Sequence, residues 1–161
     1  MFVQVCYNEY LSYWVCQVTW PRLPTLDTVP GAQVTILMVA DPQIVGNIHE
    51  PSGVLGWVRR WDCDQYLAKS YAWALSSYSD ISTVIFMGDL IDEGSEVDDQ
   101  MFADYAERFH GVYPVREGVS MVYIPGDNDI GGEGADPVTI NKMDRYFDKN
   151  QLILCKNKRK Y

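Results

Sequence analysis

The chain has 161 residues, of which 47% are hydrophobic and 22% charged, a composition typical of a globular domain rather than a disordered segment. Its formal net charge of −9 disfavours nucleic-acid binding, which requires a basic face. The charge is compatible with a site that holds cations among carboxylates, and equally with an acidic, solvated surface. The four cysteines include no C-x-x-C pair, so neither a zinc knuckle nor a thioredoxin-type motif is expected.

Residues 1–20 include an aromatic and apolar segment, "YLSYWVCQVTW", from Tyr10 to Trp20. The segment is shorter than the roughly 20 residues that cross a bilayer, and it lacks the basic region and cleavage site of a signal peptide. Its tyrosines and tryptophans are typical of a membrane–water interface, and a peripheral or core-packing helix is the alternative. Residues 21–33, "PRLPTLDTVPGAQ", are rich in proline and predict a linker.

Residues 34–149 alternate between two kinds of pattern and predict one α/β domain. Continuous apolar runs predict three strands covered on both faces, at residues 34–40, 82–87 and 119–124. Helical spacing predicts three helices, at residues 57–79, 96–113 and 137–150. Asp98 or Asp99 is the expected cap of the second helix, and Pro137 suits the start of the third. The order β-α-β-α-β-α predicts a parallel sheet with helices on its faces, followed by a basic tail at residues 150–161.

Acidic residues follow each predicted strand at once. The three stretches are "ADPQ" with Asp41 and Gln43, "GDLIDEG" with Asp89, Asp92 and Glu93, and "GDND" with Asp127, Asn128 and Asp129. Each stretch alone is compatible with an ordinary turn. Neighbouring parallel strands bring such loops together at one edge of the sheet, where the carboxylates repel one another unless protons or cations neutralise them. Two divalent ions about 3.5–4 Å apart are a common arrangement for phosphoester hydrolysis.

The three stretches together resemble the motifs of the calcineurin-like metallophosphoesterases, which are D-x-H, G-D-x-x-D and G-N-H-D/E after successive strands. The counterparts in this chain are "DPQ" at 41–43, "GDLID" at 88–92 and "GDND" at 126–129. The resemblance implies the N-terminal β-α-β-α-β-α portion of the layered α/β/β/α fold of that family.

A narrower resemblance is to the membrane-bound branch of the family, which removes ethanolamine phosphate from glycosylphosphatidylinositol (GPI) anchors. "GDLIDEG" and "GDNDIGGEG" are similar to that branch, and "NEYLSYWVCQVTWPRL" resembles the end of its first transmembrane helix. The resemblance implies a protein of the endoplasmic reticulum or Golgi membrane with its catalytic side in the lumen. It also implies membrane association through the N-terminus and a phosphodiester substrate such as the glycan of a GPI-anchored protein.

The resemblance implies that two divalent metal ions are held by the side chains of four residues, Asp41, Gln43, Asp89 and Asp127. In this arrangement Asp89 bridges the two ions. Gln43 stands where the family has a histidine ligand, and Asp127 stands where it has an asparagine. Exchanging imidazole nitrogen for amide and carboxylate oxygen favours Mn²⁺ or Mg²⁺ over Zn²⁺ or iron, and Mn²⁺ is the expected ion.

Three further residues receive roles from the resemblance. Asp92 and Asp129 are expected to orient the neighbouring ligands. Asn128 is the candidate catalytic residue, at the position of a histidine that assists the leaving group. Its amide can donate a hydrogen bond but cannot transfer a proton at neutral pH.

Two functions are therefore expected from the sequence. The first is a metal-dependent phosphodiesterase, as the activity of the parent protein. The alternative is a non-catalytic truncated isoform or fragment with an incomplete metal site, because the only histidines, His49 and His110, match no ligand position of the family.

Overall fold

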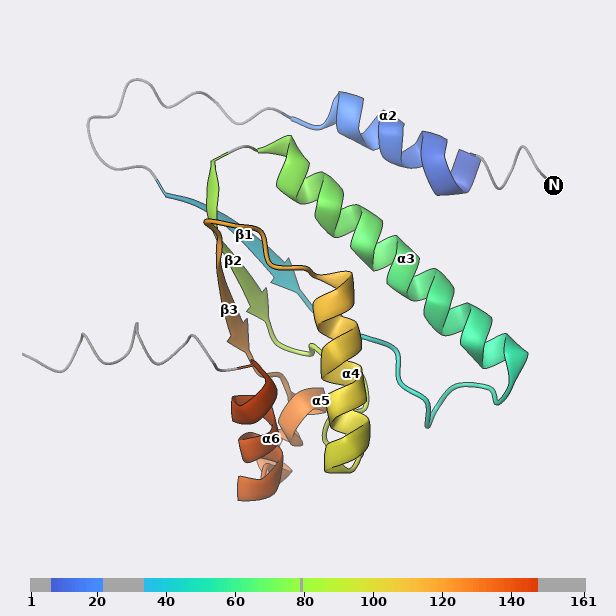
Figure 1. The fold of residues 1–161 in the computed structure, drawn as a ribbon, viewed down its shortest axis with the longest axis vertical. Helices are drawn as coiled ribbons and strands as arrows, with labels where there is room; N and C mark the ends of the chain where they lie inside the picture. The colour runs from blue at the N-terminus through green and yellow to red at the C-terminus, as the bar shows by residue number, and fades with distance from the viewer. Residues whose placement is uncertain (1–6, 22–33, 79, 148–161) are drawn as a thin grey trace, which may run out of the picture.

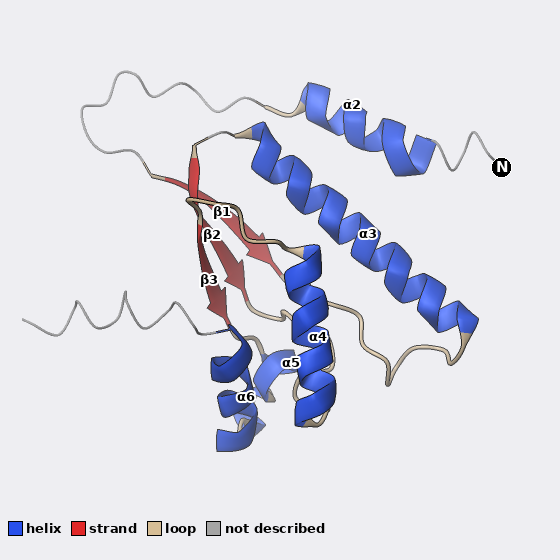
Figure 2. Ribbon diagram, viewed as in Figure 1, coloured by secondary structure: helices blue, strands red, loops and turns tan. Residues whose placement is uncertain are grey.

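The computed structural model describes residues 7–21, 34–78 and 80–147 of the chain. Its centre is a parallel sheet of three strands, β1 (Thr35–Ala40), β2 (Ile81–Met87) and β3 (Ser120–Ile124), in the order β1-β2-β3. Helix α3 (Val54–Ser77) connects the first two strands, and α4 (Asp99–Val112) connects the second and third. Figure 2 shows this alternation of strands and helices, which confirms the predicted α/β class.

Three short helical segments and two longer helices complete the described chain. A π-helical turn, η1 (Tyr7–Leu11), leads into α2 (Ser12–Thr19), which lies alongside α3 in Figure 1. After β3 come α5 (Asp127–Ile130), the 3-10 turn η2 (Gly132–Gly134) and α6 (Pro137–Phe147), beyond the carboxyl ends of β2 and β3 in Figure 1. Within the described ranges, no helix combines the length and the apolar character needed to cross a membrane.

Two predicted segments fall almost entirely outside the described residues. Only Pro21 of the predicted linker at residues 21–33 is described, and the predicted basic tail at residues 150–161 lies beyond the described chain.

The core is an aromatic cluster between the sheet and the helices that follow it. Phe86 of β2 is fully buried, and its ring lies 5.1 Å from that of Phe109 on α4 and 5.0 Å from that of Tyr113, both edge-on. Phe147 of α6 packs edge-on against Phe109 at 5.2 Å. Edge-to-face contacts of this kind add to the free energy gained by burying apolar surface, so they fix α4 and α6 relative to β2.

The prediction that the strands are covered on both faces is wrong. Side chains of β1 alternate between half-buried and exposed, and Ile36 and Met38 on the open face are 48% and 63% exposed. Register places Met87 and Ile124 opposite Ala40 on that face, and both are exposed as well. The cause is that the described helices pack against one face of the sheet. The continuous apolar runs therefore belong to strands that are covered on one face only.

The ends of the helices follow the sequence closely. Asp98 is the cap of α4, because its Oδ1 accepts a hydrogen bond of 2.8 Å from the Met101 N–H, and α6 begins at Pro137 as predicted.

On α6 the ammonium of Lys142 is buried and donates to the carbonyl oxygen of Val97 at 2.6 Å. A buried ammonium is tolerated where carbonyl oxygens replace water, so Lys142 ties α6 to the loop before α4.

Candidate metal site at the strand ends

The loops that follow the three strands are joined to one another by backbone hydrogen bonds. Gln43 N–H donates to the Asp89 carbonyl oxygen at 2.9 Å, and Ile44 N–H donates to that of Leu90 at 3.0 Å. Asp92 N–H donates back to the Ile44 carbonyl oxygen at 3.1 Å. The first and second loops therefore continue the parallel pairing beyond the ends of β1 and β2.

The second and third loops are joined in the same way. Gly88 N–H donates to the Ile124 carbonyl oxygen at 2.9 Å, and Ser95 N–H donates to that of Asn128 at 2.7 Å. Gly126 passes so close to Asp89 that an added Cβ would collide with the Asp89 side chain and backbone nitrogen. A glycine is required at this position because of that close approach.

Backbone strain is concentrated at three of the predicted ligands. Asp41, Gln43 and Asp89 have φ angles of 47°, 31° and 48°, and they are the only non-glycine residues with positive φ in the described chain. Such conformations cost of order 1–3 kcal/mol each and persist where the surrounding structure imposes them, typically at binding and catalytic sites. The strain falls on the residues that the sequence motifs single out.

The carboxylate of Asp89 is the centre of the site. Its Oδ1 accepts from the backbone N–H of Asn128 at 3.2 Å, and its Oδ2 accepts from Asn128 Nδ2 at 3.3 Å. Gln43 Nε2 donates to the same Oδ2 at 3.4 Å. All three side chains are half-buried, and each comes from a different loop. The structure thus brings together Gln43, Asp89 and Asn128.

Asp129 is fully buried beneath these residues. Its carboxylate accepts from the backbone N–H groups of Leu90 at 3.0 Å, Ile91 at 2.9 Å and Gly126 at 2.8 Å. Burial raises the pKa of the Asp129 carboxyl and the charge of Asp89 adds to this, while the three donors oppose both. Asp129 therefore holds the second loop against the third and fixes the backbone that carries Asp89.

A second buried carboxylate, Glu93, holds the first loop. It accepts from the backbone N–H groups of Asn47 at 2.9 Å, Ile48 at 2.9 Å and His49 at 2.8 Å, and from the hydroxyl of Tyr105 at 3.1 Å. Burial by itself raises the pKa of Glu93, but these donors outweigh it and the pKa lies below its usual value. The sequence placed Glu93 in an acidic stretch but gave it no role, because nothing local identifies the distant loop that it binds.

The remaining predicted residues lie at the margin of the site. Asp41 ends the first strand and Asp127 begins α5, both exposed, while Asp92 is half-buried. Among the described residues, no three histidine, cysteine, aspartate or glutamate side chains come together in a way that could hold a metal ion. In the described part of the chain, the side chains that donate hydrogen bonds to the Asp89 carboxylate are the amides of Gln43 and Asn128.

The two histidines have partners elsewhere. The ring of His49 lies 3.3 Å from a carboxylate oxygen of Glu96, and a ring nitrogen of His110 lies 3.2 Å from the carbonyl oxygen of Tyr146. Neither contact involves a strand-end residue.

By residue type, the ligands predicted from the sequence suit a hard divalent cation. Carboxylate oxygens of Asp41, Asp89 and Asp127 and an amide oxygen of Gln43 are ligands of the kind that Mn²⁺ and Mg²⁺ prefer. Fold and contacts together define the class of protein: a parallel α/β protein with an oxygen-rich candidate metal site at the carboxyl edge of its sheet.

Comparison with known proteins relates the chain to the metallophosphoesterases. It is 23% identical over 149 residues to Metallophosphoesterase 1 homolog of Drosophila melanogaster, an alignment that covers 91% of this chain and 38% of the relative. It is 25% identical over 162 residues to Metallophosphoesterase 1 homolog of Caenorhabditis elegans, with 98% and 41% covered. Cell division control protein 1 of Saccharomyces cerevisiae is 26% identical over 121 residues, with 73% and 24% covered.

These matches support a metallophosphoesterase relationship, and such proteins use divalent metal ions. No protein-family model matches the chain. The chain spans about two fifths of the length of the Metallophosphoesterase 1 relatives that it matches.

Proposed function

We propose that the protein containing this chain is a metal-dependent phosphodiesterase with a calcineurin-like fold, whose site is built around Asp89. The observation that carries the proposal is the meeting of Gln43, Asp89 and Asn128, from three strand-end loops, around one carboxylate. The positive φ angles of Asp41, Gln43 and Asp89 support it, because strained backbone of this kind is typical of functional sites. The relationship to metallophosphoesterases supports the reaction class.

In this proposal Asp41, Gln43, Asp89 and Asp127 would hold two divalent ions, and Asp89 would be a ligand of both. When bound, the ions polarise a phosphoryl oxygen and lower the pKa of water. Asp129 and Glu93 keep the three loops in place through the backbone N–H groups that they accept from. Asn128 Nδ2, which donates to Asp89 in the present structure, is positioned to donate to a phosphoryl oxygen of a bound substrate.

The metal proposed for this site is Mn²⁺. Amide and carboxylate oxygens supply the donors, and imidazole, which favours zinc, is not among the groups around Asp89 in the described residues. The leaving group receives no proton from Asn128, because an amide does not titrate near neutral pH, so we expect faster hydrolysis of esters whose leaving groups are good.

The substrate proposed for the parent protein is the ethanolamine phosphate of GPI anchors, in the lumen of the endoplasmic reticulum or Golgi. The resemblance of "GDLIDEG" and "GDNDIGGEG" to the branch with that activity supports this assignment. Membrane association through the N-terminus is supported by Tyr10, Trp14 and Trp20, which are all exposed around α2, since such rings favour the membrane–water interface. The net charge of −9 argues against a nucleic-acid partner.

A second candidate is a non-catalytic half-site. It is favoured by the finding that, in the part of the chain that is described, acids and histidines form no group of three able to hold a metal ion. In this case the chain binds one divalent ion weakly and hydrolyses nothing.

The test is a calorimetric titration of the 161-residue chain with Mn²⁺, together with an assay on bis(p-nitrophenyl) phosphate. We expect saturable binding in the wild type, loss of binding in Asp89→Asn, and retention in Asp104→Asn, an exposed acid on α4. Turnover lost in Asp89→Asn supports the phosphodiesterase, and binding without turnover supports the half-site. Absence of Mn²⁺ binding by the wild type contradicts both.

A further inference from the structure

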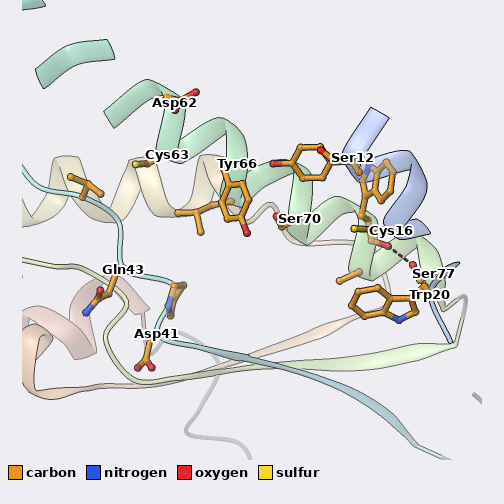
Figure 3. A pocket seen from close by; sticks show the side chains of 16 residues that line it. Ser12, Cys16, Trp20, Asp41, Gln43, Asp62, Cys63, Tyr66, Ser70 and Ser77 are labelled. Carbon is orange, nitrogen blue, oxygen red and sulfur yellow. Dashed lines mark hydrogen bonds between the residues drawn. The ribbon is translucent and has the colours of Figure 1, made fainter. Parts of the chain in front are cut away.

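A pocket of about 960 Å³ lies between α2, α3 and the loop after β1. Figure 3 shows it from close by, with Asp41 and Gln43 at one end and Trp20 at the other. Its volume is within the range of small-molecule sites, roughly 300–1,000 Å³. Four aromatic side chains from α2, α3 and the segment after α2 line it, and they are Tyr13, Trp20, Tyr66 and Trp73.

Two of these rings are largely exposed, and contacts with other side chains restrain both of them. Tyr66 is 61% exposed and Trp20 is 51% exposed. The ring of Tyr66 lies 6.1 Å from that of Tyr13 on α2, and Trp20 donates from Nε1 to the hydroxyl of Tyr78 at 2.9 Å. Restrained side chains lose little conformational freedom when a ligand binds, so these rings are suited to contact a ligand in the pocket.

Hydroxyl groups alternate with the rings along α3. Four side chains of this helix line the pocket at intervals of three or four residues, which places them on one face of the helix, in the order Tyr66, Ser70, Trp73 and Ser77. Ser77 Oγ donates to the carbonyl oxygen of Trp73 at 2.8 Å, and its oxygen can still accept a hydrogen bond from a ligand. This face of α3 therefore offers apolar ring surface and hydrogen-bonding groups side by side.

The charges around the pocket disfavour an ionic occupant. Among the described residues that line it, the charged side chains are Asp41 and Asp62, which would repel an anion. Lys69 places its ammonium 5.8 Å from the centroid of the Tyr13 ring, so a second cation at that wall would meet a like charge. An uncharged group is therefore expected between α2 and α3.

A sugar ring matches an uncharged occupant of this lining. One face of a pyranose presents C–H groups that can stack on an aromatic ring, and its rim presents hydroxyls that can bond to serine or remain in water. A purely apolar group would face the hydroxyls of Ser70 and Ser77 without forming hydrogen bonds to them. The alternation of rings and hydroxyls along α3 thus favours a group that is itself apolar on one face and polar at its edge.

The pocket adjoins the candidate metal site. Asp41 and Gln43 line it, and Gln43 Nε2 donates to Asp89 Oδ2 at 3.4 Å. A single ligand can therefore place a phosphate at the strand ends and the neighbouring group between α2 and α3.

We propose that this pocket binds the sugar next to the phosphate of a glycan phosphodiester, with a pyranose ring stacked on the aromatic side chains of α3. The inference rests on the proposed function for the position of the phosphate, and it agrees with a substrate in which an amine and a sugar flank that phosphate. It deepens that function by assigning α2 and α3 as the elements that select the glycan.

The test titrates the 6-phosphates of glucose, mannose and galactose into the 161-residue chain by calorimetry, with Mn²⁺ present and then with a chelator. Sorbitol 6-phosphate is the control ligand, because it carries the same charge and a similar set of hydroxyls but has no ring to stack. We expect at least one hexose phosphate to bind at least about fivefold more tightly than sorbitol 6-phosphate, the equivalent of about 1 kcal/mol.

Variants of α3 locate this preference. Tyr66→Ala removes a ring from the wall and is expected to abolish the preference, whereas Tyr66→Phe keeps the ring and is expected to retain it. Trp61→Ala, which removes an exposed ring of α3 outside the pocket, is expected to leave it unchanged. If Tyr66→Ala does not fold, Trp73→Ala makes the same test, with Trp57→Ala as its exposed control outside the pocket.

The outcomes separate this inference from the proposed function. A hexose preference that persists with chelator, in a chain that binds no Mn²⁺, supports the pocket and contradicts the metal site. Normal Mn²⁺ binding with equal affinities for the hexose phosphates and sorbitol 6-phosphate overturns the sugar pocket and leaves the metal site standing. Phosphoethanolamine that binds more tightly than every hexose phosphate, and loses this advantage in Tyr66→Ala, assigns the pocket to the amine and also overturns the inference.

Discussion

Glu93 and Asp129 are both buried carboxylates, but their pKa values are shifted in opposite directions. Each carboxylate is fully buried and accepts from three backbone N–H groups, yet the pKa of Glu93 is lowered and that of Asp129 is raised. Glu93 has a fourth donor in the Tyr105 hydroxyl, whereas Asp129 is more strongly desolvated and lies near the negative charge of Asp89. The balance between donors and neighbouring charge decides the direction of each shift.

The lowered pKa of Glu93 makes its contribution to stability depend on pH. A carboxyl whose pKa is lower in the folded state than in the unfolded state contributes fully above the unfolded value, here about 4.5, and loses its contribution as pH falls through the folded value. We therefore expect Glu93→Gln to reduce the free energy of unfolding at pH 7 by about 1–3 kcal/mol, because charged acceptors are lost from buried N–H groups. The difference from wild type shrinks below pH 4.5.

Urea denaturation of wild type and Glu93→Gln across this pH range measures the effect. Glu96→Gln is the matched control, because the Glu96 side chain is exposed and pairs with His49 at the surface, where such pairs contribute little. Equal destabilisation by the two variants, or a Glu93→Gln effect that is independent of pH, contradicts this account.

At the scale of the element, β1 separates a packed face from an open one. Leu37 and Val39 pack against the core, whereas Ile36 and Met38 are exposed. We expect Met38→Gln to change stability by less than about 0.5 kcal/mol and to reduce the binding of a hydrophobic dye, since the open face loses apolar surface. Leu37→Gln is expected to cost about 1–3 kcal/mol, because it buries an amide among apolar side chains.

Thermal unfolding and dye fluorescence of the two variants measure this asymmetry. A large destabilisation by Met38→Gln would show that the open face is covered, and similar effects of the two substitutions would contradict the exposure pattern of β1.

The elements themselves could be predicted from the sequence because their signals are local. Apolar runs bounded by glycine and proline locate the strands, and the cap at Asp98 and the proline at 137 locate helix starts. The open face of β1 could not be predicted, because "TILMVA" has the same apolar character on both of its faces. Trp57 and Trp61 have the helical spacing of a buried apolar stripe, but both side chains are exposed. The cause is that α3 begins well away from the strands, as Figure 1 shows.

For the candidate site, the sequence predicted which loops meet but not which side chains touch. Strand-end position alone brings residues 41–43, 88–92 and 126–129 to one edge of the sheet. The contacts of Gln43 and Asn128 with Asp89 depend on positive φ angles and on the close passage of Gly126, and neither follows from spacing. The metal-ligand roles of Asp41, Gln43, Asp89 and Asp127 remain predictions.

At the scale of the whole molecule, the site joins segments that are distant in sequence, so a bound ion is expected to stabilise the entire fold. A ligand that binds only the folded state stabilises that state by about 2.7 kcal/mol when the free ligand concentration is one hundred times the dissociation constant. For a chain of this size that corresponds to a rise in melting temperature of roughly 5–10 °C. We expect this rise with Mn²⁺ in the wild type, its reversal by chelator, and no rise in Asp89→Asn.

Differential scanning calorimetry of the two proteins, with and without Mn²⁺, measures the shift. A rise of the same size in Asp89→Asn would place the ion elsewhere on this acidic chain. An unchanged melting temperature in the wild type at saturating Mn²⁺ would contradict a site that connects the three loops.

The hydrogen bonds between the strand-end loops have a consequence for the exchange of amide protons with solvent. The N–H groups of Gln43, Ile44, Gly88 and Asp92 all donate to carbonyl oxygens of a neighbouring loop or strand, as ladder amides do. Exchange at these amides then requires neighbouring strands to separate, and fluctuation of a single loop is not sufficient. In deuterated solvent they are expected to exchange at the slow rates of β2, so that the loops that carry the candidate site are among the last parts of the molecule to open.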